Sequence, residues 1–106
     1  FTIPSDFESW DTNAFTFNYA TESTSSLNNK VDFSVYLESN ETIDDNSNVG
    51  EVSSISGDWT SVNVLGSNLN ICNAPEQTCV LVIRMYSKSD NYVRVGDIDI
   101  NYNREL

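Results

Sequence analysis

Apolar side chains alternate with polar ones along much of this sequence, and that period of two constrains the fold more than any other feature. The clearest stretch is 31–37, where Val31, Phe33, Val35 and Leu37 alternate with polar or amphipathic residues. Because successive side chains of a strand point to opposite faces, this pattern is typical of a β-strand with one buried face. No window places apolar residues three and four apart over three helical turns, so we expect an all-β protein.

Further strands with the same character are predicted at 15–19, 59–65, 80–85 and 92–102. Residues 80–85 form a nearly continuous apolar run, which predicts the most deeply buried strand. In 92–102 the alternation changes phase at Gly96, and a glycine inside a strand indicates a bulge or a close approach. Polar loops rich in Ser and Asn separate the strands at 21–30, 39–48, 66–78 and 87–91. Six or seven short strands with such turns predict one domain over 1–106, an antiparallel β-sandwich.

Charge excludes several classes of partner. Sixteen acidic and five basic residues give a net charge of −11, and the chain contains no His. Five scattered cations cannot form the basic face that a nucleic acid needs, so we expect no nucleic-acid partner. No apolar run approaches the roughly 20 residues of a membrane span, so we expect no membrane insertion. The charge is compatible with cationic partners, above all hard metal ions.

Cys72 and Cys79 are the two cysteines of the chain. Two sulfurs without a His cannot complete a zinc site, so we predict that they form a disulfide, with two unrelated thiols as the alternative. A disulfide indicates an oxidising compartment, and hence an extracellular or cell-surface location. The sequon Asn40-Glu41-Thr42 would accept a glycan if the source is eukaryotic.

Two pairs of carboxylates lie near the two ends of the chain: Asp6 with Glu8, and Asp97 with Asp99. Members of a pair are two residues apart, so in an extended segment both point to the same side, and Phe7 points inward. If the first and last strands meet, these pairs repel each other unless a cation lies between them, and Ca²⁺ binds six to eight oxygen atoms. The alternative is that both pairs are simply solvated.

Three segments of the sequence resemble the MAM domain and its bacterial relatives, the cleaved-adhesin domains. They are Asp6-Phe7-Glu8, Gly57-Asp58-Trp59-Thr60-Ser61-Val62 and Val95-Gly96-Asp97-Ile98. Those families begin with an Asp-Phe-Glu type segment, carry a Gly-x-Trp strand, and close with an apolar-x-Asp-Ile strand. The resemblance implies a jelly-roll sandwich and a structural cation, most simply Ca²⁺, held by Asp6, Glu8 and Asp97.

A second candidate for calcium is the stretch 44–50, where Asp44, Asn46 and Asn48 place oxygen atoms at alternate positions. An EF-hand would also need a glycine at position 49 and a glutamate at position 55, and the chain has Val and Ile there. We therefore interpret this stretch as a polar hairpin loop.

Catalysis is not expected. Paired carboxylates such as Glu38 and Glu51 could serve a glycosidase. However, a sandwich of this length rarely offers a deep cleft, and without His the many serines have no activating base.

Aromatic residues are the main candidates for binding a ligand. Most are predicted to be core, including Trp59, which opens a strand. Tyr36 is out of phase with its apolar neighbours and should face outward, and Tyr86 ends the most apolar strand at a loop. Trp10 lies beside an acidic residue in an expected loop. Exposed rings of this kind stack on the C–H face of a pyranose.

Arg84 and Arg94 are the two cations on predicted strands, and either could bind a carboxylate or a pair of sugar hydroxyls. We predict a noncatalytic extracellular binding module for carbohydrate or cell adhesion, with a glycan or a protein surface as its partner. Its ligand-binding residues would be Tyr36, Tyr86, Trp10 and Arg84, within a larger secreted or surface protein. The alternative is a structural or coat subunit that self-assembles through its sheet edges.

Overall fold

The structure is a computed structural model that describes residues 1–38, 42–43, 58–88 and 90–105. These residues form six β-strands and one short 3-10 turn, so the prediction of an all-β protein is confirmed. The elements are β1 (Phe7–Thr21), β2 (Asn29–Leu37), β3 (Thr42–Ile43), β4 (Thr60–Leu65), η2 (Gly66–Asn68), β5 (Cys79–Ser87) and β6 (Val93–Arg104). The candidate calcium loop at 44–50, residues 40–41 of the sequon and Glu51 lie outside the described residues.

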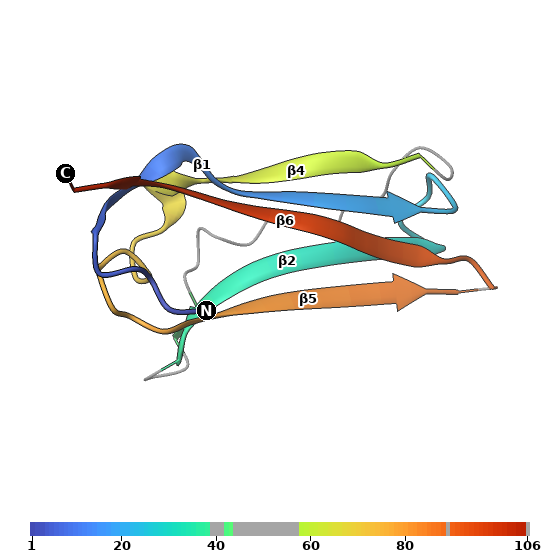
Figure 1. Ribbon diagram of the computed structural model, residues 1–106. Helices are drawn as coiled ribbons and strands as arrows, with labels where there is room; N and C mark the ends of the chain where they lie inside the picture. The colour runs from blue at the N-terminus through green and yellow to red at the C-terminus, as the bar shows by residue number, and fades with distance from the viewer. Residues whose placement is uncertain (39–41, 44–57, 89, 106) are drawn as a thin grey trace.

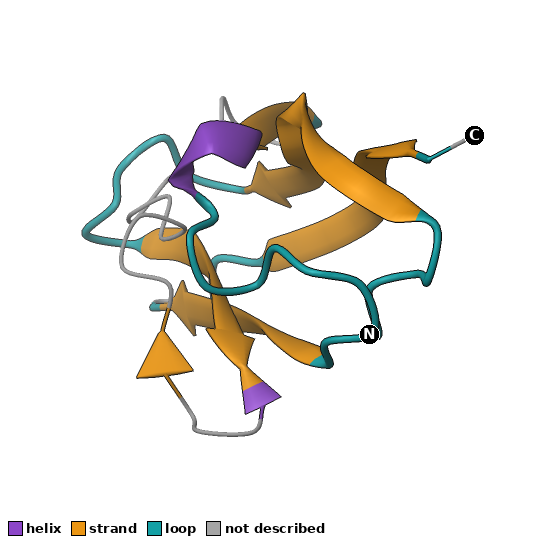
Figure 2. Cartoon of the chain, turned by 90° about the vertical axis from the view of Figure 1, so that its left-hand side faces the viewer, coloured by secondary structure: helices purple, strands orange, loops and turns teal. Residues whose placement is uncertain are grey.

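The strands form two antiparallel three-stranded sheets, ordered β4-β1-β6 and β3-β2-β5, which lie in two layers (Figure 1). The first long strand pairs with the last: Phe7 lies opposite Arg104, and Thr21 lies opposite Val93. Seen from the end that carries both chain termini, the two sheets are separate layers connected by loops (Figure 2). Among the described residues, no helix has the length and apolarity to cross a membrane.

The core lies where the central strands β1 and β2 face each other. Phe15 and Phe17 of β1 and Phe33 of β2 are fully buried, as the alternation predicts. The rings of Phe17 and Phe33 stack with centroids 4.1 Å apart and planes 9° apart, and this aromatic contact joins the two sheets. Burial of each such side chain stabilises the fold by about 1.5–3 kcal/mol. Burial also raises the pKa of Tyr19, which lies beside Phe33.

The apolar run 80–85 is not the most buried strand, and that prediction is wrong. It forms most of β5, which lies at the edge of its sheet, and Val80 and Met85 are exposed. β2 occupies the central position of this sheet and buries Val31, Phe33 and Val35 completely. A continuous apolar run indicates two apolar faces, but pairing on both sides decides which strand is central, and that depends on the rest of the chain.

The predicted bulge at Gly96 is confirmed. Phe17 lies opposite Ile98, but Tyr19 lies opposite Val95, so β6 has one extra residue over this interval. The extra residue keeps both Val95 and Ile98 packed against the core. It also leaves Gly96 and its neighbour on the outer side of the sheet, which is the feature that builds the site described below.

Candidate ligand-binding surfaces

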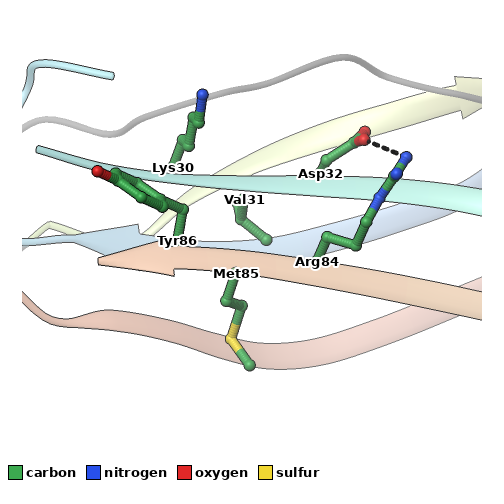
Figure 3. A pocket seen from close by; sticks show the side chains of 6 residues that line it. All are labelled: Lys30, Val31, Asp32, Arg84, Met85 and Tyr86. Atoms are coloured by element: carbon green, nitrogen blue, oxygen red, sulfur yellow. Dashed lines mark hydrogen bonds and ion pairs between the residues drawn. The ribbon is translucent and has the colours of Figure 1, made fainter. Parts of the chain in front are cut away.

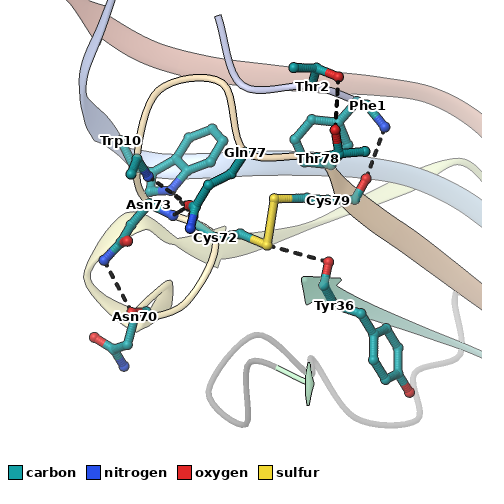
Figure 4. Close-up of a disulfide and its surroundings, with 11 residues drawn as sticks. Phe1, Thr2, Trp10, Tyr36, Asn70, Cys72, Asn73, Gln77, Thr78 and Cys79 are labelled. Atoms are coloured by element: carbon teal, nitrogen blue, oxygen red, sulfur yellow. Dashed lines mark hydrogen bonds between the residues drawn. A yellow bond between two sulfur atoms is a disulfide. The ribbon is translucent and has the colours of Figure 1, made fainter. Parts of the chain in front are cut away.

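Cys72 and Cys79 form a disulfide, as predicted (Figure 4). Their Cα atoms are 6.2 Å apart, and both residues are fully buried. The bond ties the loop after η2 to the first residue of β5. Within the loop it closes, the side-chain oxygen of Gln77 accepts hydrogen bonds from the backbone N–H groups of Asn73 and Ala74, both at 2.9 Å. The disulfide fits an oxidising compartment.

Trp10 lies within β1, so its predicted location in a loop is wrong. Its ring packs edge-on against Phe7 at 5.0 Å and lies 5.3 Å from Phe15. Its indole N–H donates a 2.7 Å hydrogen bond to the carbonyl oxygen of Cys72 (Figure 4). A half-buried indole whose polar group is satisfied in this way braces the disulfide loop and offers little to a ligand.

The three carboxylates predicted to share a calcium ion do not come together. Asp6 and Glu8 lie at the start of β1, beside Arg104 at the end of β6. Asp97 lies seven residues back along β6, which is about 23 Å for an extended strand. The carboxylate of Asp6 instead accepts a 3.3 Å hydrogen bond from the hydroxyl of Tyr102.

The physical reason is the antiparallel pairing of the first and last strands. That pairing brings the start of β1 to the end of β6, whereas Asp97 lies in the first half of β6. Among the described residues, no three His, Cys, Asp or Glu side chains gather closely enough to hold a metal ion. The residues named for Ca²⁺ therefore do not fit a single ion.

The outer face of the β3-β2-β5 sheet carries three of the predicted ligand residues, Tyr36, Arg84 and Tyr86, and Figure 3 shows the part with Arg84 and Tyr86. Arg84 lies opposite Asp32, and their side chains form a 2.8 Å ion pair. Lys30 lies opposite Tyr86, with its ammonium 5.4 Å from the ring centroid. Tyr86 is 44% exposed, as predicted, and these side chains line a hollow of about 270 Å³. The charged groups here already pair with one another and with the ring.

Tyr36 lies on the same sheet but far from Tyr86. It pairs with Val80, and Tyr86 is six residues farther along β5, about 20 Å away. Its own hollow of about 420 Å³ is lined by Leu37, Glu38, Val80 and Val82. The structure therefore does not bring Tyr36 and Tyr86 into one platform.

The prediction that Trp59 belongs to the core is also wrong, because its side chain is 56% exposed. It immediately precedes β4 and lies on the outer face of the β4-β1-β6 sheet. There it lines a hollow of about 340 Å³ together with Asn18, Gly96 and Asp97. A Cβ atom added at Gly96 would lie 2.9 Å from the Cζ3 atom of the indole, so the ring rests directly against the backbone of β6.

Polar groups surround this ring. The side-chain amide of Asn18 donates a 3.2 Å hydrogen bond to the backbone carbonyl of Asp97, which ties the rim of the hollow together. On the same face of β6, two residues before Gly96, the guanidinium of Arg94 stacks 4.4 Å above the centroid of Tyr92. An exposed indole, an amide, a carboxylate and a guanidinium thus share one face of the sheet.

A signal for this exposure was present in the sequence. Val62 and Val64 pack into the core, and Trp59 is three residues before the first of them. An odd spacing along a strand places a side chain on the opposite face. Phase therefore predicts an outward Trp59, while residue type alone predicts a core one.

No protein-family model, curated protein or solved structure matches this chain. The resemblance to MAM and cleaved-adhesin domains accordingly stays a prediction that depends on its three short segments.

Proposed function

We propose that this chain is a noncatalytic extracellular module that binds a glycan on the outer face of the β4-β1-β6 sheet. The observation that carries the proposal is Trp59, an indole that lies exposed against Gly96 beside Asn18 and Asp97. A flat aromatic face favours the C–H face of a sugar ring, and neighbouring amide and carboxylate groups bind the hydroxyls at its rim.

The scaffold of this module is a β-sandwich of the jelly-roll type. Two antiparallel sheets with a shared core support it, as does the contact between Phe17 and Phe33. The buried disulfide between Cys72 and Cys79 supports an extracellular or cell-surface location. A rigid scaffold of this kind holds a shallow surface in a fixed shape, which lowers the entropy lost when a ligand binds.

The ligand is neutral and not acidic. Asp97 and Asp99 are both exposed on the strand that borders the hollow, and the chain as a whole carries a charge of −11. Carboxylates attract the hydroxyl groups of a neutral sugar as hydrogen-bond acceptors, but they repel uronic or sialic acids.

A glycan array that includes neutral plant and microbial polysaccharides tests the proposal, with Trp59→Ala as the variant and Tyr86→Ala as its matched control. Both residues are exposed aromatics, one on each sheet. We expect binding by the wild type and by Tyr86→Ala, and a loss of about tenfold or more in Trp59→Ala, which corresponds to about 1.4 kcal/mol.

Two results would overturn the assignment. If Trp59→Ala binds as the wild type does, the indole is not the platform. If Tyr86→Ala or Tyr36→Ala loses binding while Trp59→Ala keeps it, the ligand lies on the β3-β2-β5 face, where these residues and Arg84 were first predicted to act.

Self-assembly through sheet edges is the second candidate, and one observation favours it. β5 and β6 each lie at the end of their sheet's strand order in the described part of the chain. Met85 and Ile100 on these strands are 59% and 42% exposed, although their partners Val31 and Phe15 are fully buried. Such edges can pair with a second copy. Size-exclusion chromatography over a concentration series distinguishes the two functions, because a glycan-binding monomer elutes at the same volume throughout.

A further inference from the structure

We propose that the Trp59 surface binds a linear chain of neutral pyranoses, with one sugar stacked on Trp59 and an adjacent sugar held by Arg94. This inference rests on the proposed function and adds to it the ligand class and a second subsite. The chain would lie on the outer face of the β4-β1-β6 sheet. Its sugars would have equatorial hydroxyl groups, as β-1,4-linked glucose does.

The two groups are neighbours on one face. The ring of Trp59 ends against Gly96 on β6. Arg94 precedes that glycine by two residues, so both project to the outer side of the sheet, and their Cα atoms are about 7 Å apart. The indole and the guanidinium therefore occupy adjacent positions on this surface.

The guanidinium is held in place before any ligand arrives. Its Cζ atom lies 4.4 Å from the centroid of the Tyr92 ring, a cation–π contact that restrains the side chain. Tyr92 is itself anchored, because its backbone N–H donates a 3.1 Å hydrogen bond to the carboxylate of Glu22 and its carbonyl accepts one of 3.0 Å from the Glu22 N–H. A guanidinium over an aromatic ring can still donate two parallel hydrogen bonds from its edge, a geometry that matches two adjacent hydroxyls.

A small residue of β1 lies between Trp59 and Arg94. Ala20 on β1 lies directly opposite Arg94, and the neighbouring pair is Tyr19 with Thr60, the residue after Trp59. These three positions form a row across the sheet: Trp59, Ala20 and Arg94. Ala20 is 1% exposed, so its methyl group is covered and leaves the surface of the row to the side chains of Trp59 and Arg94. A long side chain there would stand between the indole and the guanidinium.

The chemistry of this row selects the ligand. A pyranose with equatorial hydroxyls presents an apolar C–H face to the indole and its hydroxyls at the edge, within reach of donors and acceptors on either side. Trp59 and Arg94, at the two ends of the row across the strands, are both exposed. An open surface of this kind accommodates internal units of a chain, whereas recognition of a chain end would need a closed pocket.

Calorimetric titration with a length series from glucose to cellohexaose tests the inference, with Arg94→Ala as the variant. We expect the wild-type affinity to rise by about tenfold or more between glucose and the trimer or tetramer and then to level off. Arg94→Ala should bind the shorter sugars as before and lose this rise. Arg84→Ala, the same change on the opposite sheet, is the matched control and should keep it.

Two further variants separate positioning from charge. Arg94→Lys keeps the charge but lacks paired planar donors, so it should behave like Arg94→Ala. Tyr92→Ala should reduce the rise with chain length in part, because the guanidinium remains but is no longer held.

The outcomes for the inference and for the proposed function are distinct. If affinity does not depend on chain length, or if Arg94→Ala keeps the rise, the second subsite does not exist, although Trp59-dependent binding still supports the proposed function. If the array shows Trp59-dependent binding to a glycan but no cello-oligosaccharide binds, the ligand class is wrong. If Trp59→Ala binds every probe as the wild type does, both the proposed function and the inference about the second subsite are wrong.

Discussion

The two tryptophans of this chain each lie against a glycine, yet one is partly buried and the other is exposed on the surface. The Cβ of Trp10 is 2.8 Å from the position that a Cβ would take at Gly66, and the ring of Trp59 is 2.9 Å from that position at Gly96. Trp10 is partly buried and donates its N–H to the carbonyl oxygen of Cys72. Trp59 lies on the outer face with more than half of its surface exposed.

The difference comes from which part of the tryptophan meets the glycine and from what lies beyond. At Gly66 the contact is at the base of the side chain, so the indole is left to reach into the core and the disulfide loop. At Gly96 the contact is the six-membered ring of the indole, which packs against the backbone of β6 while more than half of the Trp59 surface stays exposed. A tryptophan that packs closely against a glycine is thus held in position, but this contact does not determine whether its indole is buried or exposed.

The largest expected difference is in stability. Trp10→Ala should destabilise the fold by about 3–5 kcal/mol, because it removes a packed aromatic side chain and leaves the Cys72 carbonyl without its donor. Trp59→Ala should cost about 1 kcal/mol or less, since the side chain is mostly exposed. Urea unfolding of the two variants measures both values, and similar losses would contradict the assignment of one ring to the core and the other to the surface.

Trp10→Phe refines this test. It keeps much of the ring packing and removes the hydrogen bond to Cys72, so its cost should fall well below that of Trp10→Ala. If the two variants are equally unstable, the hydrogen bond and not the packing dominates at this end.

Removal of the disulfide beside Trp10 should have the next largest effect on stability. Replacement of Cys72 and Cys79 together by Ala should cost about 2 kcal/mol, the low end for disulfides, because the loop between them is short. Thiol titration of the denatured, nonreduced wild type should detect no free thiol, and the detection of two would contradict both the bond and the oxidising compartment. Glycan binding at Trp59 should survive the double replacement wherever the protein is folded.

Features set by local sequence were predictable. Alternation gave β2 closely, the change of phase at Gly96 marked the bulge, and the two cysteines without a His indicated the disulfide. Each of these depends on residues that are near one another in the chain, where side-chain period and chemistry suffice.

Features that depend on the pairing of strands far apart in the sequence were not predictable. The apolar run in β5 was expected at the centre of a sheet but lies at its edge, and the carboxylates of Asp6 and Asp97 were expected together. The register of β1 against β6 separates these two carboxylates, and that register depends on strands far apart in the sequence. For Trp59 the two kinds of sequence evidence conflict. Its position in the alternation predicts an exposed side chain, whereas its residue type predicts a buried one.

The two glycines should respond differently to the same methyl group. At Gly66 the new Cβ would overlap the carbonyl oxygen of Asp11, a backbone atom that cannot move cheaply, so Gly66→Ala should cost about 1–3 kcal/mol. At Gly96 the obstacle is the exposed ring of Trp59, which can swing away, so Gly96→Ala should change stability by less than about 1 kcal/mol.

Gly96→Ala should nevertheless weaken glycan binding, because the added methyl group displaces the indole from its position against β6. Fluorescence in a Trp10→Phe background reports on Trp59 alone and should change on this substitution. An unchanged spectrum with unchanged affinity would mean that the glycine does not position the ring.

The smallest expected effect is the contribution of Asp97 to any stabilisation of the fold by calcium. Along β6, about 23 Å of strand separates Asp97 from the residue opposite Phe7, so one ion cannot bind Asp6, Glu8 and Asp97 together. A ligand that binds only the folded state raises stability by about 2.7 kcal/mol at a hundredfold excess over its dissociation constant. Melting in calcium and in EDTA would reveal such a gain, and Asp97→Ala should leave any difference between the two unchanged. If calcium raises the melting temperature of the wild type and Asp97→Ala abolishes that shift, Asp97 is a ligand, and the pairing of β1 with β6 must differ from the register described above.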